Sequence, residues 1–430
     1  MTHTPQQILE ISKKYGTPTY VYNEKTIVDN CNRLLSMPNA FGLKVRYAMK
    51  ANSSKAILQL ITSTGVEIDA SSLNEVKRAL LSGVSADKIL LTTHEIPLGE
   101  EKKELEKLIL QGLVYNICSL NQLRNIKEFA AENQVKLSIR VHPGKGTGES
   151  SSRNTGDNYS CFGVHLENLP QAIKEGNEGK LIFDQVHVHI GSGGDPEAWK
   201  ENIDRQLGFV NKYFPQATRV NFGGGFKVGR MPHEQDADIH DLGVYANEKV
   251  EGFYKETGRK LNMEIEPGTF VVAKAGSLIT KVIDRKKTGK NGFDFVVLDG
   301  GMEVSMRPLL YGSQHPFTII SKEGTLISDE SQIAQLKDVA ERVIVGKCCE
   351  SGDSQCLDKS GNISPRKMGN PAIGDLVVIG ATGAYSSALS PNNYNSHLMP
   401  PEVLIRNDGN LQLIRKKQNF EEIMTNEIGL

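Results

Sequence analysis

A lysine, two carboxylates and two histidines lie at the ends of short apolar runs in the first 270 residues. Lys50 ends VRYAMK, Asp69 ends GVEID, His187 and His189 lie in QVHVHI, and Glu266 ends LNMEIE. A buried ammonium is costly to desolvate, so a lysine at the end of a buried strand is either exposed or used in chemistry. Metal-assisted hydrolysis could use this set, because two histidines spaced two apart on a strand point to the same side.

Pyridoxal phosphate chemistry could use the same residues. A lysine forms an imine with the aldehyde of this cofactor, a carboxylate keeps its pyridine nitrogen protonated, and glycine-rich loops bind its phosphate. The sequence offers Lys50, Glu266, GSGG after His189, and the triple glycine of NFGGGF. Metal hydrolases of barrel architecture usually place their His-x-His on the first strand, where this chain has Lys50. Alone, a strand-end lysine is ordinarily a surface residue and a triple glycine a tight turn, but together these residues favour the cofactor.

Eight strand-like runs must position these side chains. From about residue 40, short apolar runs alternate with stretches of helical spacing, such as SSKAILQLITSTG, which end in glycine. About eight such units in roughly 230 residues are typical of a (β/α)₈ barrel, whose chemistry lies at the C-terminal ends of its strands. A doubly wound sheet is the alternative, but it would carry a nucleotide-binding turn that the sequence lacks. We therefore predict an α/β fold with a cofactor-binding barrel at 36–280.

A mainly β second domain is predicted at 281–430. FDFVVLDGG, RVIVGKCCE, GDLVVIGATGAY, PPEVLIRNDG and LQLIRKK are separated by turn residues, without long helices between them. PTYVYNEKTI also has the composition of a strand. We expect this N-terminal part, 1–35, to join the β domain.

Composition excludes several other classes of protein. The 430 residues suffice for two domains, and 50 Lys and Arg against 51 Asp and Glu give no general attraction to nucleic acid or an anionic membrane. No apolar run has the length of a membrane span, and the N-terminus lacks a signal-peptide core. The six cysteines form no CxxC pair, so we expect reduced thiols and a cytoplasmic location.

Six motifs in order resemble one known family. YAMKAN, HVHIGSGG, NFGGGF, EIEPG, CCESGD and GAYSSALSPNNYN are similar to those of the alanine-racemase-like, fold type III, pyridoxal phosphate decarboxylases. They are most similar to the branch that acts on diaminopimelate. The resemblance implies a barrel followed by a β domain, a homodimer with shared active sites, and pyridoxal 5'-phosphate. It further implies conversion of meso-2,6-diaminopimelate to L-lysine, the last step of lysine biosynthesis, with no metal.

The resemblance also assigns residues to the cofactor. Lys50 would form the imine, Glu266 would pair with the pyridine nitrogen, and His189 would stack on the ring and act in catalysis. The remaining cofactor residues that it implies are Asp69, Arg140, Ser192, Gly223, Gly224, Gly225, Gly268 and Tyr385.

Four further residues are assigned to catalysis and the substrate. By the resemblance, Cys349 of the partner subunit would return a proton and Glu350 would bind the distal amine. Arg307 and Tyr311 of MRPLLYG, with Tyr385, would hold the distal carboxylate, for which a guanidinium is suited. A redox or metal cluster in CCESGDSQC is the alternative for that motif taken alone.

Three positions depart from the family pattern. Thr269 replaces the usual arginine after EPG, Cys161 replaces the usual lysine of SKFG, and the late arginine after YN is absent, with His397 the nearest candidate. These changes remove positive charge near the site. They allow a different substrate, such as ornithine, lysine, arginine or a polyamine precursor. A non-catalytic homologue is a further alternative, against which retention of Lys50 and Glu266 argues.

Overall fold

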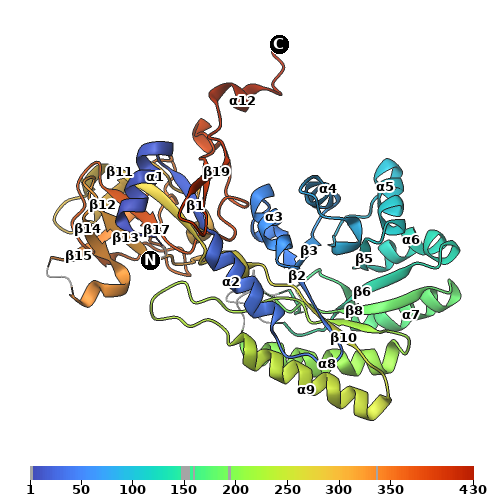
Figure 1. Ribbon diagram of the computed structural model, residues 1–430. Coiled ribbons are helices and arrows are strands. Elements are labelled where there is room, and N and C mark those ends of the chain that lie inside the picture. Colours follow the sequence, from blue (N-terminus) through green and yellow to red (C-terminus); the bar gives the residue numbers. More distant parts are fainter. Residues whose placement is uncertain (1–2, 147–154, 158–159, 192–194, 336–337) are drawn as a thin grey trace. The chain divides into compact units, whose positions relative to one another are not determined.

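The computed structural model describes residues 3–146, 155–157, 160–191, 195–335 and 338–430 (Figure 1). The chain divides into two compact units, each described here by itself. We name them the barrel unit, Val28–Val228 with Asp236–Val271, and the β unit, Met1–Ile27 and Gly229–Gln235 with Val272–Leu430.

The barrel unit is built on eight parallel strands in the order β5-β4-β3-β2-β10-β9-β8-β6, and pairing of β5 with β6 closes the ring. Helices cover the outside of such a barrel and side chains fill its inside, so its strands are short and mostly buried. The strands are β2 (Leu43–Ala48), β3 (Glu67–Ala70), β4 (Ile89–Thr92), β5 (Val114–Ile117), β6 (Lys136–His142), β8 (Ile182–His187), β9 (Arg219–Asn221) and β10 (Asn262–Ile265). The predicted barrel is confirmed, and β7 (Val164–His165) pairs with the end of β6.

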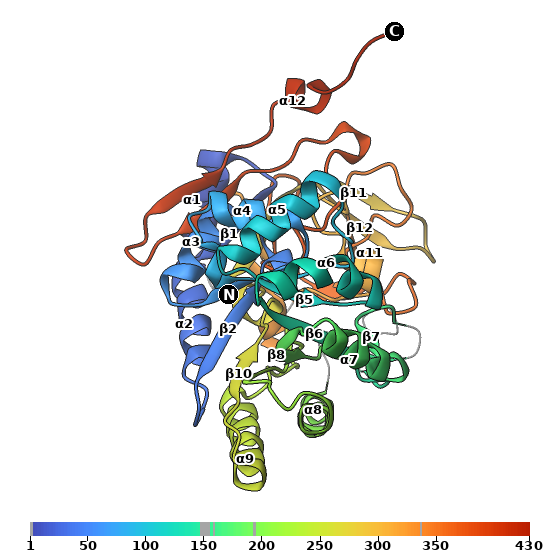
Figure 2. The ribbon, with the colours of Figure 1, turned by 90° about the vertical axis from the view of Figure 1, so that its right-hand side faces the viewer.

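Helices follow the strands and lie around them (Figures 1 and 2). Two of them, α4 and α6, begin at serine caps: Ser72 accepts a hydrogen bond from the N–H of Glu75, and Ser119 from that of Gln122. The helices are α2 (Glu24–Leu35), α3 (Lys55–Ser63), α4 (Leu73–Leu81), α5 (Gly99–Leu110), α6 (Leu120–Glu132), α7 (Leu169–Glu178), α8 (Pro196–Tyr213), α9 (Ile239–Thr257) and α10 (Thr269–Val272). The long helices α8 and α9 pack against each other.

One strand boundary differs from the prediction. Strand β8 begins at Ile182, three residues before QVHVHI, and ends at His187, so His189 lies beyond the strand. The argument that both histidines point to one side of a strand was therefore wrong. The strand ends there because Val188 donates its N–H to Asn221 and the chain then enters the glycine-rich turn.

The β unit contains a ten-stranded sheet. Its main path is β14-β13-β17-β11-β1-β18-β19, and β12, β15 and β16 extend it from β11. Its strands are β1 (Thr19–Asn23), β11 (Gly276–Lys287), β12 (Asp294–Leu298), β13 (Phe317–Ile320), β14 (Leu326–Asp329), β15 (Ala340–Val345), β16 (Arg366–Met368), β17 (Leu376–Ile379), β18 (Glu402–Ile405) and β19 (Leu411–Arg415). The N-terminal strand β1 pairs antiparallel with β11 and parallel with β18, and helix α1 (Pro5–Tyr15) buries Ile8 and Ile11 against this sheet.

The sequence analysis missed four of these strands. The longest, β11, alternates buried and exposed residues and ends in the charged run DRKK, which hid its length. The strands β13, β14 and β16 are only three or four residues long. Short edge strands carry too little periodicity to be separated from loops.

No helix among the described residues is long and apolar enough to cross a membrane.

A buried ion network lies inside the barrel toward the N-terminal ends of its strands. Arg46, with a fully buried side chain, places Nε 2.7 Å from Glu264 Oε2 and Nη1 2.9 Å from Glu67 Oε2. Arg219 lies 3.2 Å from the other Glu264 oxygen and 2.8 Å from Asp184. Burial alone would raise the pKa of Glu264, but the Arg46 and Arg219 charges hold it below its ordinary value.

Replacement of Arg46 by methionine should destabilise the barrel by about 3 kcal/mol, because it leaves the Glu264 carboxylate buried with one partner fewer. Since the folded-state pKa of Glu264 is depressed, its contribution is present above its unfolded pKa and is lost as the pH falls. The difference between the wild type and Arg46→Met should therefore shrink toward acid pH. Urea denaturation at several pH values measures it. The double variant Arg46→Met/Glu264→Met should recover most of the loss; equal instability of both variants at every pH would contradict the network's role.

Candidate active site

Lys50 is the exposed member of an otherwise buried turn at the end of β2. Residues Met49–Ala51 form one turn of 3₁₀ helix in which Met49 and Ala51 are buried and the Lys50 side chain is exposed. The Tyr47 hydroxyl donates to the main-chain oxygen of Asn52, 3.1 Å away. The packed neighbours therefore fix the backbone and leave the amine accessible at the C-terminal end of the barrel strands.

Glu266 lies just after β10, the strand that pairs with β2, and is held by two side chains. Asn221 Nδ2 donates to Glu266 Oε1 over 2.7 Å, and His187 Nε2 lies 3.0 Å from Oε2. Burial, then the cations Arg140 and Lys50, lower the pKa of His187 far below its usual value, so this imidazole is neutral. Both oxygens of the carboxylate are thus oriented by uncharged groups.

Asp69 and Glu266 form a pair of buried carboxyl groups. Burial and the neighbouring Glu266 raise the pKa of Asp69 well above its ordinary value. Burial also raises the pKa of Glu266, although Arg140 and Lys50 pull it down. Asp69 Oδ1 is buried with no hydrogen-bond partner among the described residues. The pair therefore has room for one more positive charge or proton donor.

A glycine turn and His189 form one wall of the site. Gly224 donates its N–H to His189 Nδ1 over 3.2 Å, and burial followed by the Arg140 and Lys50 charges lowers the pKa of His189 well below its usual value. The imidazole is therefore neutral, with its proton on Nε2. A Cβ on Gly223 would lie 2.6 Å from the main-chain oxygen of Val188, with φ at +67°. Only glycine fits this close approach.

The other two glycines of the turn are equally confined. A Cβ on Gly225 would lie 2.5 Å from the Gly191 oxygen, and one on Gly224 would overlap the Glu266 oxygen. Gly268 packs against Ala48 and Ala51, where a Cβ would lie 3.2 to 3.3 Å from their side chains. The backbone at 223–225 is thus a tight turn that requires glycine, in which the Gly223 N–H donates to Asn221 Oδ1 and the Gly224 N–H to His189 Nδ1.

Arg140, on β6, supplies a second cation. Its side chain is buried, with the guanidinium carbon 4.8 Å from the ring centre of Phe162, and Phe162 also packs edge-on against His94. Arg140 Nη2 is buried without a hydrogen-bond acceptor in the described part of the chain. An anionic group could satisfy it.

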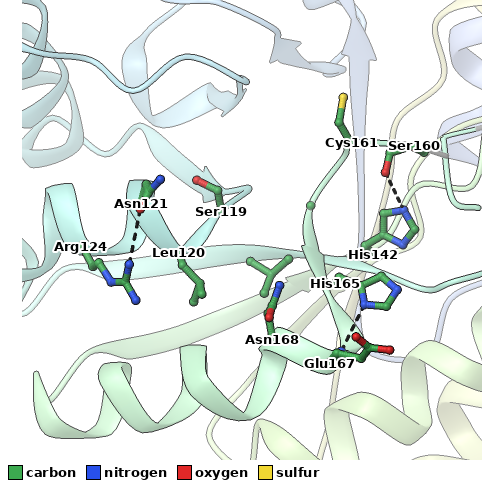
Figure 3. A pocket seen from close by; sticks show the side chains of 12 residues that line it. Ser119, Leu120, Asn121, Arg124, His142, Ser160, Cys161, His165, Glu167 and Asn168 are labelled. Carbon is green, nitrogen blue, oxygen red and sulfur yellow. Dashed lines mark hydrogen bonds between the residues drawn. The ribbon is translucent and has the colours of Figure 1, made fainter. Parts of the chain in front are cut away.

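His142 lies elsewhere, in a cavity of about 630 Å³ that neither Lys50 nor Glu266 lines (Figure 3). Its Nδ1 accepts the N–H of Gly144 and its Nε2 lies 3.1 Å from the Ser160 oxygen, so both ring nitrogens have partners. Cys161, at the position of the usual family lysine, is exposed at the rim of this cavity. The structure of this cavity therefore does not show why the family lysine is absent at Cys161, or which residue replaces its positive charge.

In the β unit, the structure brings Arg307, Tyr311 and Tyr385 together. Arg307 begins helix α11 (Arg307–Tyr311) and is 1 % exposed. Its guanidinium carbon lies 5.5 Å from the Tyr311 ring centre and 5.8 Å from that of Tyr385, and Nη2 donates to Ser313 Oγ. Tyr385 has a positive φ of +56°, which is uncommon for this residue type and marks a constrained position.

Cys349 and Glu350 are exposed on one loop of the β unit. The Cys349 N–H donates to Asn395 Oδ1 over 2.8 Å, and the Tyr394 hydroxyl lies 3.4 Å from Glu350 Oε2. Asn395 has a φ of +51°, so the turn that holds the loop is itself strained. The structure thus presents these two side chains outward from a fixed backbone.

Sequence reasoning placed most of these residues but missed their supports. Lys50, Asp69, Arg140, His189 and Glu266 share one electrostatic environment in the barrel unit. Ser192 lies outside the described residues. The supports that sequence reasoning missed in the barrel unit are Asn221, His187 as a partner of Glu266, and Phe162. In the β unit it missed Tyr394 and Asn395, which contact Glu350 and Cys349. Asn221 could have been found, since it ends β9 directly before the triple glycine.

The barrel residues fit pyridoxal phosphate. Two buried carboxyl groups, one with an unpartnered oxygen, match a protonated ring nitrogen; the crowded glycine turn matches a phosphate; and the exposed Lys50 amine matches an aldehyde. Among the described residues, the group of carboxyl and thiol side chains close enough together to hold a metal is Glu303, Cys348 and Asp353, which includes neither His187 nor His189. The donor set therefore supports the cofactor over metal hydrolysis.

Comparison with known proteins agrees with this site. Residues 26–273 match the family model of the pyridoxal-dependent decarboxylases, pyridoxal binding domain, and the chain belongs to this family. It is a pyridoxal-phosphate-dependent carboxy-lyase, so the predicted enzyme class, cofactor and fold are confirmed.

The chain is similar over nearly its full length to individual diaminopimelate decarboxylases. The chain is 32% identical to diaminopimelate decarboxylase of Escherichia coli K12, over 99% of this chain and 97% of the relative, and 31% identical to that of Methanothermobacter thermautotrophicus, over 97% and 92%. A crystal structure of a diaminopimelate decarboxylase matches with a TM-score of 0.88, 30% identity, and coverage of 99% and 96%. One from M. jannaschii in complex with L-lysine matches with a TM-score of 0.84, 27% identity, and coverage of 98% and 94%.

Proposed function

We propose that this chain removes carbon dioxide from meso-2,6-diaminopimelate and thereby produces L-lysine. The observation that carries the proposal is Arg307, a buried guanidinium between Tyr311 and Tyr385. A guanidinium is suited to bind a carboxylate through two hydrogen bonds. Diaminopimelate has a distal carboxylate, whereas ornithine, lysine and arginine do not. Full-length similarity to diaminopimelate decarboxylases supports the same substrate.

The residues of the barrel unit would hold the cofactor. Lys50 Nζ would bind its aldehyde carbon, Glu266 its ring nitrogen, and the Gly223 to Gly225 turn with Ser192 its phosphate. By the resemblance, Tyr385, which belongs to the β unit, would also bind the phosphate. When bound, pyridoxal phosphate accepts the electron pair released as the carboxylate leaves. Neutral His189 would cover the ring face without adding charge, because burial keeps its pKa low.

Two groups, Cys349 and Lys50, are the candidates for proton transfer to the substrate. The Cys349 thiol or the Lys50 ammonium would return a proton to the α-carbon after carbon dioxide departs. Glu350 would bind the distal ammonium of the substrate, since hydrogen bonds from Ser351 and the neighbouring backbone lower the pKa of its carboxyl and keep it ionised. Arg307 and Tyr311 would fix the opposite charge of the same distal end.

The assembly belongs to the same proposal. We place Cys349 and Glu350 in the active site of the partner subunit of a homodimer, and their exposure on a fixed loop supports this. The domain limits 36–280 and 281–430 and a cytoplasmic location are proposed with it.

A sister decarboxylase is the second candidate, and Thr269 is the observation that favours it. Where the family has an arginine after EPG, Thr269 offers only a hydroxyl. The loss of one charge-assisted hydrogen bond costs about 1.5–3 kcal/mol if nothing replaces it. Such a loss would favour a substrate with less negative charge.

Decarboxylation of a panel of amino acids tests the proposal. Purified, cofactor-loaded protein should release carbon dioxide from meso-diaminopimelate, with lysine as the product, and little from ornithine, arginine or lysine. Arg307→Met should lower kcat/KM for diaminopimelate by about a hundredfold, the equivalent of a lost charged hydrogen bond of about 3 kcal/mol. Arg406→Met, at a half-exposed arginine paired with Glu24, is the control and should have no effect. Release of carbon dioxide from another substrate alone would replace diaminopimelate with that sister activity.

A further inference from the structure

A buried cluster of two carboxyl groups and a thiol lies beneath the loop that carries Cys349. Glu303, Cys348 and Asp353 are each less than a tenth exposed, and one ligand atom from each lies within 4.8 Å of the others. Cys348 directly precedes the exposed Cys349, so the two neighbouring thiols have opposite environments. None of the three buried residues has a part in the function proposed above.

Four hydrogen bonds hold the cluster, and two of them, from Cys348 Sγ to Glu303 and from the Met302 N–H to Asp353, join two segments of the β unit. Glu303 Oε2 accepts from the Gly301 N–H over 2.8 Å and from Cys348 Sγ over 3.2 Å. Asp353 Oδ1 accepts from the Met302 N–H over 2.7 Å, and its Oδ2 from the Cys348 N–H over 2.8 Å. One segment, 301–303, leads into Arg307, while the other, 348–353, contains Cys349 and Glu350.

The two segments are in direct contact around these bonds. A Cβ on Gly301 would overlap the Asp353 carboxylate, and one on Gly346 would overlap Gly301. A Cβ on Gly352 would lie 2.8 Å from Leu309 Cδ1, within helix α11. The packing leaves no slack, so the position of one segment fixes that of the other.

The donor arrangement argues for hydrogen bonding over metal binding. Three of the four carboxylate oxygens already accept a bond from an N–H or S–H group. A metal would require the Cys348 thiolate. Burial and the adjacent Glu303 raise the pKa of Cys348, so its thiol keeps the proton that it donates.

We propose that Cys348 is a positioning residue, which ties Cys349 and Glu350 to the segment of Arg307 through its bonds to Glu303 and Asp353. This inference deepens the proposed function and rests on it. In the proposed homodimer, the segment of Arg307 serves the active site of its own subunit and the segment of Cys349 and Glu350 serves that of the partner, so the tie fixes one against the other the segments that serve the two sites. Displacement by about 1 Å of a group that must meet the substrate can cost about a hundredfold in rate.

The experiment compares Cys348→Ala and Cys348→Ser in the holoenzyme. Alanine removes the S–H donor, so kcat should fall about tenfold to a hundredfold while KM changes little, and serine should restore kcat to within about threefold. The second readout needs no substrate. Iodoacetamide labelling, resolved by peptide mapping, should show a changed rate at Cys349 in the alanine variant and an unchanged rate at the exposed Cys161. Cys31→Ala, which removes a buried thiol from helix α2, is the control and should alter neither rate.

Several outcomes would overturn the inference. The first is that Cys348→Ala leaves both kcat and the Cys349 labelling rate unchanged. The second is that Cys348→Ala and Cys31→Ala lose kcat equally. The third is that the wild type contains a stoichiometric metal that Cys348→Ala lacks. If Cys348→Ala does not fold, Glu303→Gln takes its place, since glutamine keeps the side-chain volume but loses the charge that attracts both hydrogen-bond donors. We expect the same change in Cys349 labelling in this variant. Its absence would count against the proposal. Wild-type protein inactive on diaminopimelate would refute the proposed substrate, while the labelling still decides the role of Cys348.

Discussion

Lys50→Ala should lower decarboxylation by at least about a thousandfold, since it removes both the proposed covalent anchor of the cofactor and one of two candidate proton donors. The absorption band of the protein-bound cofactor should disappear with the activity. The structure shows why no other side chain should take over the role of Lys50. Lys50 is the exposed residue of a turn whose neighbours Met49 and Ala51 are buried, so another side chain cannot move into its place.

Lys55→Ala is the matched control for this prediction. Lys55 is exposed at the start of helix α3, five residues along the chain, and should leave activity and absorption unchanged. Steady-state release of carbon dioxide and a spectrum of the dialysed protein measure both effects. A Lys50→Ala enzyme that still turns over would remove the lysine from the chemistry altogether.

The barrel was predictable because its signal is repeated. Eight apolar runs at regular spacing, separated by helical stretches, repeat one pattern often enough that an error of a few residues in β8 does no harm. The sequence of the β unit predicts its strands less clearly. Its sheet joins β1 near the N-terminus to β18 near the C-terminus, and no local pattern reports a pairing over nearly four hundred residues. The domain limits predicted from the change of pattern near residue 280 stay a prediction.

The candidate reactive side chains can be picked out from the sequence, while the residues that support them mostly cannot. Lys50 and Glu266 stand out because charged residues at the ends of apolar runs are costly and therefore unusual. Asn221 has a local signal, since it ends a strand near the triple glycine, but its contact with Glu266, like that of His187, follows only once β8, β9 and β10 are known to be neighbours in the barrel. Likewise, the contact of Asn395 with the Cys349 backbone joins positions 46 residues apart. Such contacts depend on tertiary structure, and short sequence motifs do not encode them.

Substitution of Glu266 by glutamine should lower kcat by about a hundredfold to a thousandfold, the usual cost of removing one preorganised electrostatic contact from an active site. Glutamine keeps the size of the side chain and an oxygen for Asn221, but it carries no charge to hold a proton on the ring nitrogen. Burial raises the pKa of Glu266, so its carboxylate is stable only with a cation nearby. The cationic ring would supply that charge, and the neutral His187 would not.

Glu264→Gln separates this electrostatic role from a general effect of losing a buried carboxylate. Glu264 lies two residues earlier, is equally buried, and is paired with Arg46 and Arg219 toward the opposite end of the strands. Its replacement should lower the stability of the barrel but leave kcat within about threefold, because it touches no group of the proposed site. Cofactor occupancy, read from the absorption spectrum, must be equal in the variants compared. Loss of kcat to the same extent in both would mean that Glu266 acts on the stability of the barrel and has no special charge–charge contact with the ring.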